Sequence, residues 1–493
     1  MGTDESDIDI TEYAARLPFE VDAGALPEYR EQIAAQEEIL ATLDTLPTPD
    51  PPDREHWAPD EETDPLGAFL TRCAIEDDAD GPLAGMTVAI KDNIAVGGVP
   101  MTCGSPLLAD YVPPEDATVV TNLLAAGARI VGKANMDEFA FGRDRSTMRF
   151  RVAKNPHDPD HQPGSSSAGS GVAVGTGQVD VALGTDTGGS VRFPAAWSGV
   201  VGLKPTRGLV SHHGFVQFAK TLDTIGPLAR ETLPAARALA AMAGEDPHDL
   251  YTRGVSVGEY VPAVERGHET DPSELTIGIP EELWGQAPEL DTVTRAALDR
   301  LADAGAELRD VSIDAYEYAL PGWLGIGVTE VGAYFRANLS NYWLPALSDP
   351  SLTAAFATAQ ADNPDEPGSI IRSNRLFAEY LNDTHGDRYY ALAQQARERV
   401  TESVDRALAD VDVLASTTVP MLAPAWGEET EDTIDAVANT APFNLTGHPA
   451  LSVPCGTIDG LPVGLQFVAG HFEEATAFRA GAHWEAIYDG IPS

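Results

Sequence analysis

The segment from His161 to Lys204 constrains the fold of this chain more than any other part of its 493 residues. It contains two turns dense in glycine and serine, Gly164 to Gly171 and Gly184 to Ser190. Between them, the apolar run from Val179 to Leu183 predicts a buried strand. Glycine-rich turns let the backbone approach a ligand closely and direct several N–H groups at one point. We therefore expect a ligand site here rather than two flexible loops, because linkers do not alternate so closely with apolar strand formers.

From Pro65 onward the chain alternates short apolar strands with helices. Met86–Ile90 and Arg129–Val131 predict strands, and the apolar helix expected over Ala117–Ala126 ends at Gly127. The same patterns predict further elements over Leu275–Ile279, Val293–Ala304, Asp387–Leu408 and Val411–Ala415. This alternation predicts an α/β fold, with a mixed central β-sheet covered by helices on both faces.

Residues 1–65 differ in composition from the rest of the chain. They contain 19 aspartates and glutamates against three arginines. Leu26 to Leu46 has the apolar spacing of a helix, and a linker rich in proline and aspartate follows it. We expect an N-terminal helical extension in residues 1–65 that packs on the main body or on a partner subunit. Residues 66–493 then form one domain, in which 232–430 is a more variable region that shapes the substrate pocket.

The composition limits the compartment and the partners. The net charge of −46 argues against nucleic acid as a direct ligand, because phosphates bind basic surfaces. Only five of the 31 basic residues are lysines, a bias that resembles proteins of extreme halophiles, whose salty cytoplasm screens carboxylates from one another. Cys73, Cys103 and Cys455 are too few and too far apart for a disulfide framework or a zinc site. No apolar run is long enough to cross a membrane. We expect a cytoplasmic protein.

The scarcity of lysine gives weight to Lys91, which ends an apolar strand. A buried lysine can lose its proton and act as a base, whereas arginine stays charged. Ser190 ends the turn G-T-D-T-G-G-S, where the N–H groups of Thr187, Gly188, Gly189 and Ser190 can converge as an oxyanion hole. A serine hydroxyl needs such a base to attack a carbonyl carbon. Because phosphate-loop, dinucleotide and metalloprotease motifs are absent, acyl transfer through serine is the chemistry that we expect.

Three motifs resemble the amidase signature family. They are A-I-K-D-N around Lys91, P-G-S-S-S-A-G-S around Ser166 and G-T-D-T-G-G-S-V-R-F-P-A-A around Ser190. The resemblance runs over residues 80–232 and 439–470 and is closest to bacterial amidases of nitrile-degradation pathways. It implies that Ser190 is the acyl-enzyme nucleophile. It also implies that Ser166, held in a cis peptide, relays a proton to Lys91.

The resemblance implies further residues that support the site. Asp186, Arg192 and Ser167 correspond to structural partners of the family's catalytic residues, and neither a cofactor nor a metal is implied. Ala168 stands where the family has glycine, which leaves the local backbone in question.

Two functions follow from the resemblance. The first is an amidase that hydrolyses a small-molecule linear amide to a carboxylate and ammonia, working as a homodimer through residues 1–65. The alternative is the A subunit of a tRNA-dependent Asp/Glu amidotransferase, which releases ammonia from glutamine for a partner enzyme. The stretch A-N-M-D-E-F-A is close to that branch, whereas R-D-R-S-T-M at 143–148, Phe193 and the short tyrosine pair in 387–390 depart from it.

Two further features leave their roles open. Arg143, Arg145, Arg149 and Arg151 lie within nine positions. They either form a pocket for an anion or lie on the surface and pair with neighbouring carboxylates. The aromatic-rich part between Trp323 and Tyr380 could line an apolar substrate pocket or pack in the core.

Overall fold

The computed structural model describes residues 10–77, 79–142, 144–342, 349–428 and 433–490. The chain divides into two compact units, Met1–Asp50 and Pro51–Ser493. In the first unit the described elements are α1 (Ile10–Ala14), α2 (Leu26–Leu40) and a 3-10 turn over Ala41–Thr45. No residue of α2 is buried, so its apolar side chains are all at least partly exposed. The expected helical extension is therefore present.

The boundary of this extension lies earlier than position 65. Residues 51–65 belong to the second unit because they make specific contacts with it. Arg54 donates hydrogen bonds to both carboxylate oxygens of Asp116, and the short strand β1 (His56–Trp57) pairs with β2 (Phe69–Ile75). The proline-rich linker thus ends as an edge strand of the main sheet.

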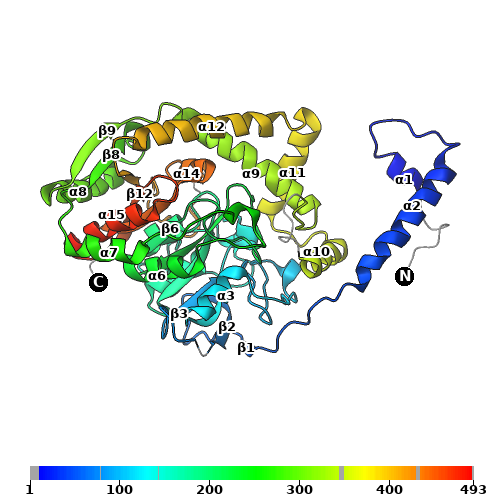
Figure 1. Cartoon of the computed structure of the whole chain (residues 1–493), viewed down its shortest axis with the longest axis horizontal. Helices are drawn as coiled ribbons and strands as arrows, with labels where there is room; N and C mark the ends of the chain where they lie inside the picture. Colours follow the sequence, from blue (N-terminus) through cyan, green and yellow to red (C-terminus); the bar gives the residue numbers. More distant parts are fainter. Residues whose placement is uncertain (1–9, 78, 143, 343–348, 429–432, 491–493) are drawn as a thin grey trace. The chain divides into compact units, whose positions relative to one another are not determined.

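One mixed sheet of twelve strands forms the centre of the second unit (Figure 1). Its spatial order is β1-β2-β4-β3-β5-β7-β6-β11-β12-β10-β8-β9. Parallel pairs join β3 to β4 and β5, and β8 to β9 and β10, whereas the other neighbours are antiparallel. The remaining strands are β3 (Thr87–Lys91), β4 (Arg129–Ala134), β5 (Val181–Asp186), β6 (Val201–Lys204), β7 (Thr224–Ala229), β8 (Thr276–Pro280), β9 (Glu307–Val311), β10 (Val413–Thr417), β11 (Ala450–Ile458) and β12 (Leu461–Val468).

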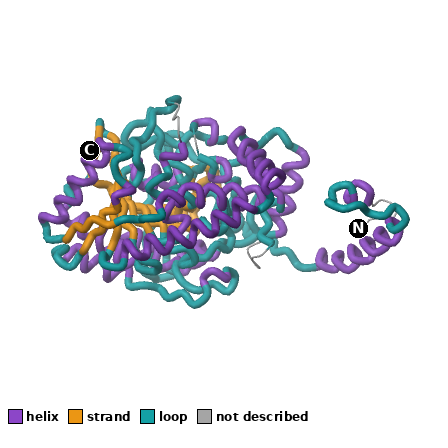
Figure 2. Tube along the Cα trace, turned by 90° about the horizontal axis from the view of Figure 1, so that it is seen from above, coloured by secondary structure: helices purple, strands orange, loops and turns teal. Residues whose placement is uncertain are grey.

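Helices cover both faces of this sheet, as the sequence predicts; in Figure 2 the strands run between helices. None of the described helices is long and apolar enough to span a bilayer. The described α-helices of the second unit are α3 (Thr118–Ala125), α4 (Ala168–Gly175), α5 (Arg192–Ser198), α6 (Thr232–Met242), α7 (Tyr260–Glu269), α8 (Pro288–Asp303), α9 (Ala319–Arg336), α10 (Pro350–Asp362), α11 (Ser369–His385), α12 (Arg388–Leu408), α13 (Thr433–Ala436), α14 (Ala441–Thr446) and α15 (Glu474–Ile487).

The alternation of side chains along β3 decides where its lysine points. Val88 and Ile90 belong to the core cluster that contains α3 and α6, whereas Ala89 belongs to the cluster that contains α4 and α5. Because successive strand residues face opposite sides of a sheet, Lys91 lies on the same face as Ala89. The fold therefore directs this lysine towards the segment that begins α4.

Candidate active site

Lys91 is fully buried at the end of β3. Its Nζ donates hydrogen bonds to Ser166 Oγ and Thr185 Oγ1, each at 2.8 Å. Burial lowers the pKa of Lys91 to about 7, although the nearby carboxylates of Asp137 and Asp186 oppose this shift. A lysine with such a pKa is neutral in part at neutral pH and can accept a proton from a hydroxyl group.

Ser166 is held by its backbone on both sides. The peptide bond between Ser165 and Ser166 is cis, and Ser167 immediately precedes α4. The Ser167 hydroxyl accepts a hydrogen bond from Thr185 N at 3.2 Å and lies 3.3 Å from Thr185 O, to which it can donate. Ser167 thus ties the start of α4 to β5, which keeps Ser166 Oγ within reach of Lys91.

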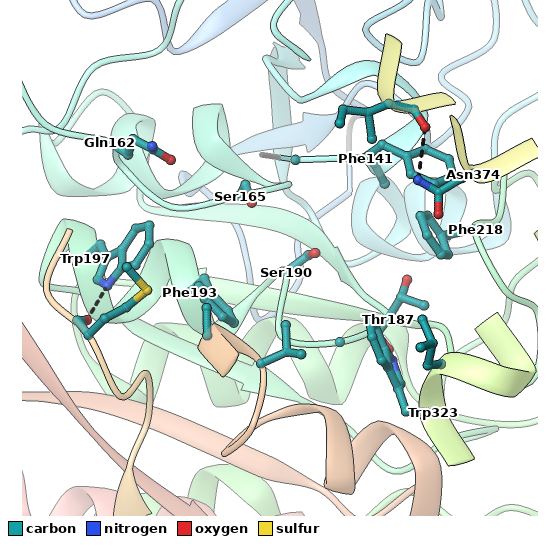
Figure 3. A pocket seen from close by; sticks show the side chains of 18 of the residues that line it. Phe141, Gln162, Ser165, Thr187, Ser190, Phe193, Trp197, Phe218, Trp323 and Asn374 are labelled. Atoms are coloured by element: carbon teal, nitrogen blue, oxygen red, sulfur yellow. Dashed lines mark hydrogen bonds between the residues drawn. The ribbon is translucent and has the colours of Figure 1, made fainter. Parts of the chain in front are cut away.

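Ser190 lies in the turn between β5 and α5 and lines a pocket (Figure 3). Its carbonyl oxygen accepts a hydrogen bond from Ser167 N at 3.3 Å, so the two serine-bearing turns are joined directly. The conformation of the turn depends on Gly189, whose φ of 134° is one that other residues rarely adopt. A Cβ atom at Gly189 would also lie 2.5 Å from the ring of Phe193.

The expected oxyanion hole needs one correction. The N–H of Gly189 donates to Asp186 Oδ1 at 2.8 Å, so it stabilises the turn and is not directed at a substrate. Of the four expected donors, Thr187, Gly188 and Ser190 remain as candidates. The sequence alone does not show which of these four N–H groups is free for a substrate, because the acceptor for Gly189 N–H is the Asp186 side chain, whose orientation depends on Arg192.

Asp186 and Arg192 form a buried ion pair beneath this turn. Arg192 Nε and Nη2 donate to the two oxygens of Asp186 at 3.0 and 2.9 Å, and Asn444 Nδ2 donates to Asp186 Oδ1 at 2.9 Å. Burial opposes ionisation of Asp186, but the charge and hydrogen bonds of Arg192 lower the pKa of Asp186 to about 2. The remaining Arg192 nitrogen, Nη1, donates to Thr440 O and Gln466 Oε1. The pair therefore connects the turn that carries Ser190 to α14 and β12.

The pocket at Ser190 has a volume of about 370 Å³ and a largely apolar lining. Aromatic rings form much of the wall, and none of the described residues that line the pocket carries a charge (Figure 3). The aromatic members are Phe141, Phe193, Trp197, Phe218 and Trp323. The polar members include Gln162, Ser165, Thr187, Ser373 and Asn374.

Two contacts around the site were not expected from the sequence. Trp323 Nε1 donates to Thr187 O at 2.8 Å, so this hydrogen bond joins α9 to the turn that carries Ser190. The wider prediction of an aromatic pocket in this region is right for Trp323, whereas Tyr334 and Phe335 pack in the core. Thr185, the second partner of Lys91, stands inside G-T-D-T-G-G-S. Its role emerges only once β3 and β5 lie side by side.

Two members of the arginine cluster, Arg149 and Arg151, pair with carboxylates of this chain. Arg149 pairs with Glu138 and Glu366, and Arg151 pairs with Asp64. Arg143 lies outside the described residues. Arg149 and Arg151 therefore pair with neighbouring carboxylates, of which Glu138 and Asp64 are buried.

Comparison with known proteins places this chain in a family. The amidase family model matches residues 68–478. The A subunit of the glutamyl-tRNA(Gln) amidotransferase of Halobacterium salinarum is 46% identical over 424 residues, covering 85% of this chain and 99% of that protein. The crystal structure of the corresponding protein from Thermotoga maritima is 31% identical, with a TM-score of 0.72 over 87% of this chain and 92% of that one. Native peptide amidase from Stenotrophomonas maltophilia is also 31% identical, with a TM-score of 0.66 over 82% and 83% of the two chains.

These relatives correct the expected partners. The expected homodimer, acting on a small-molecule amide without nucleic acid, was wrong in its assembly and in its independence of nucleic acid, because relatives at 43 to 46% identity are one component of an enzyme named for glutamyl-tRNA(Gln). The negative net charge misled here, since charge describes the surface of a single chain and not the assembly that it joins. The matched family and the coverage of its relatives show that this chain belongs to the amidase family.

Proposed function

We propose that this chain is the A subunit of a tRNA-dependent amidotransferase and releases ammonia from the side-chain amide of glutamine. The observation that carries the proposal is the 46% identity that extends over 99% of such a protein. The site supports it with a serine that lines a pocket, a buried serine that is hydrogen-bonded to a lysine, and a pKa of about 7 for that buried lysine.

The proposed mechanism assigns one role to each residue. Ser190 Oγ attacks the amide carbon, and its proton passes through Ser166 to the neutral amine of Lys91. The same proton then moves to the amide nitrogen as the carbon–nitrogen bond breaks, so that ammonia leaves and an ester to Ser190 remains. Water gives up a proton along the same path and hydrolyses this ester, which yields glutamate and restores Ser190.

Backbone N–H groups of Thr187, Gly188 and Ser190 are the proposed donors to the oxyanion that forms during both steps. One well-placed donor of this kind lowers the barrier by about 3 kcal/mol. Asp186 and Arg192 act indirectly, because they hold the turn that presents these groups.

The uncharged lining of the pocket favours a second candidate, hydrolysis of an amide with an apolar acyl group. Free glutamine carries an α-ammonium and an α-carboxylate, and charged groups of this kind bind best to opposite charges. The described lining residues provide no such partner, whereas five aromatic rings suit an aryl or alkyl group.

One experiment distinguishes the two candidates. The full chain is purified together with the partner proteins that accompany it in its own cells, and ammonia release is measured at high salt from glutamine, asparagine and benzamide. Preference for glutamine supports the amidotransferase, and preference for benzamide supports the second candidate. The Ser190→Ala variant should reduce either activity to background. Activity that survives this substitution would contradict the proposed mechanism for both.

A further inference from the structure

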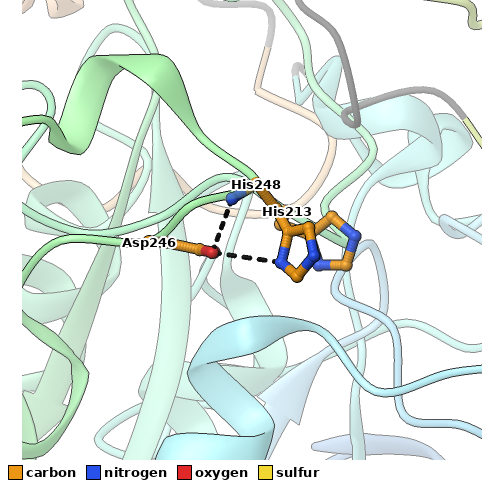
Figure 4. A group of neighbouring side chains, drawn as sticks. All are labelled: His213, Asp246 and His248. Atoms are coloured by element: carbon orange, nitrogen blue, oxygen red, sulfur yellow. Dashed lines mark hydrogen bonds and ion pairs between the residues drawn. The ribbon is translucent and has the colours of Figure 1, made fainter.

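We propose that His213, Asp246 and His248 bind one divalent transition-metal cation. His213 comes from the segment between β6 and β7, and the other two residues come from the loop that follows α6 (Figure 4). One potential ligand atom of each residue lies within 4.8 Å of the others. None of the three lines the pocket at Ser190, so this site is separate from the proposed amide chemistry.

The Asp246 carboxylate and the His248 imidazole are already close enough to bind the same cation. Asp246 Oδ1 is 3.1 Å from His248 Nδ1, and the rings of His213 and His248 have centroids 4.6 Å apart. Nitrogen and oxygen ligands bind Zn²⁺ at about 2.0–2.2 Å, so His213 needs only a small movement to complete the set. The His248 side chain is 55% exposed, which gives a cation access from solvent and leaves positions for water.

Hydroxyl groups behind the carboxylate hold it in place. Thr118 Oγ1 and Ser211 Oγ both donate to Asp246 Oδ2 at 2.6 Å. The other oxygen, Oδ1, accepts a hydrogen bond from the backbone N–H of His248 at 2.8 Å and lies beside the ring of the same residue. Thr118 Oγ1 also lies 3.3 Å from His213 Nδ1, so one hydroxyl contacts two of the three ligands. Metal ligands are commonly oriented by outer hydrogen bonds of this kind.

The ligand types indicate which cations fit. Two imidazoles with one carboxylate favour Zn²⁺, Co²⁺ or Ni²⁺ over Mg²⁺ and Ca²⁺, which prefer oxygen ligands. These residues form no local motif in the sequence, because His213 is 33 positions from Asp246 and the set forms only in the folded chain.

A second group, Asp405, His448 and His471, provides an internal comparison. His448 Nδ1 already has a partner outside the group, Thr446 Oγ1 at 2.8 Å, and His471 Nε2 has another, Thr446 O at 3.0 Å. The ring centroids of His448 and His471 are 3.8 Å apart, so the two imidazoles pack on each other with little room for an ion. We assign no cation to this group and use it as the control.

A cation bound by His213, Asp246 and His248 would fix the segment around His213, which is hydrogen-bonded to the residues that follow Lys91. Gly214 O, next to His213, accepts a hydrogen bond from Ala95 N at 2.8 Å, and Val216 N donates to Asn93 O at 2.8 Å. Asn93 lies two residues beyond Lys91. Metal binding should therefore stabilise the folded chain, because a ligand that binds only the native state raises its stability.

The test is a titration of the metal-free, tag-free full chain with Co²⁺, followed by visible absorption and thermal unfolding. We expect one saturable Co²⁺ with ligand-field bands and a higher melting temperature. The His248→Ala variant should weaken binding at least 10-fold because it removes an exposed ligand without disturbing the core, whereas His471→Ala should bind like the wild type. The proposal is wrong if the wild type binds no Co²⁺ saturably, or if His248→Ala binds it with unchanged affinity. Neither readout depends on amidase activity, so failure here leaves the proposed function intact.

Discussion

Lys91 and Ser166 are 75 positions apart in the chain, yet Lys91 Nζ donates a 2.8 Å hydrogen bond to Ser166 Oγ. The contact arises because β3 pairs with β5 in parallel and the segment before α4 crosses the same end of the sheet. Thr185 on β5 holds the other side of the amine. The lysine therefore has a set position and is shielded from water.

Replacing Lys91 with alanine should reduce kcat by about 10²–10⁴-fold, which is the range that a positioned base contributes. Lys91→Arg should fail equally, because a guanidinium does not release its proton. The measurement is ammonia release together with circular dichroism to check folding. Lys220→Ala, which changes a lysine outside the proposed catalytic residues, should keep wild-type activity. A folded Lys91→Ala protein with full activity would exclude the proposed base.

The pH dependence of kcat/KM should report the same lysine. Activity requires the neutral amine, and the pKa of Lys91 is about 7, so kcat/KM should rise with pH and level off above that value. The charge of Asp137 raises the pKa of Lys91, and the Asp137→Asn variant should therefore shift the midpoint to lower pH. A profile that falls between pH 6 and 8, or a shift in the opposite direction, would contradict this assignment.

The same pKa shift affects stability. The pKa of Lys91 is lowered on folding, so the unfolded chain binds more protons between about pH 7 and pH 10.5. This lysine therefore makes the free energy of unfolding increase with pH across that window. Chemical denaturation at pH 7 and pH 9 should show a smaller increase in Lys91→Met than in the wild type. An equal increase in both proteins would mean that folding does not lower the pKa of Lys91.

Removing Arg192 should destabilise the fold strongly. Its loss leaves the buried carboxylate of Asp186 without its main partner, which typically costs about 3–5 kcal/mol. Denaturant unfolding of Arg192→Met measures this change. The matched control is Arg336→Met, which breaks an exposed pair with Glu379 and should cost less than about 1 kcal/mol. Similar losses in the two variants would mean that the buried pair contributes little.

A methyl group at Gly188 should impair the pocket through Trp323. The added Cβ would lie 2.7 Å from Trp323 Cζ2, so the indole must move away from the turn that carries Ser190. We expect Gly188→Ala to reduce kcat/KM about 10-fold or more and Gly188→Ala with Trp323→Phe to recover part of it, since the smaller ring leaves room. Steady-state kinetics of the four proteins in this cycle decide the question. Purely additive losses would show that the two positions are not coupled.

Much of the fold could be predicted because its signals are local. The apolar run ending at Lys91, the run before Gly184 and the helix before Gly127 appear in the structure close to their expected limits. The glycine-rich turns were predicted for the same reason, since their composition allows few other conformations. Long motifs also identified the family without any knowledge of packing.

Other features depend on contacts between distant segments. Neighbouring residues do not predict that Gly189 N–H donates a hydrogen bond to Asp186, or that Arg149 pairs with Glu366. They also do not predict that the first unit ends at Asp50. The partner prediction failed in a similar way, because the charge of one chain does not describe an assembly.

The sequence by itself determined most of the elements and the two serine-bearing turns between His161 and Lys204, and it led to Lys91 as the proposed base. Only the tertiary structure decided which groups meet: Lys91 with Thr185, Trp323 with the rim of the pocket, and His213 with Asp246. The physical reason is that strand and helix periodicity repeats within a few residues. The environment of a buried side chain, in contrast, is made by segments that only the complete packing of the sheet brings together.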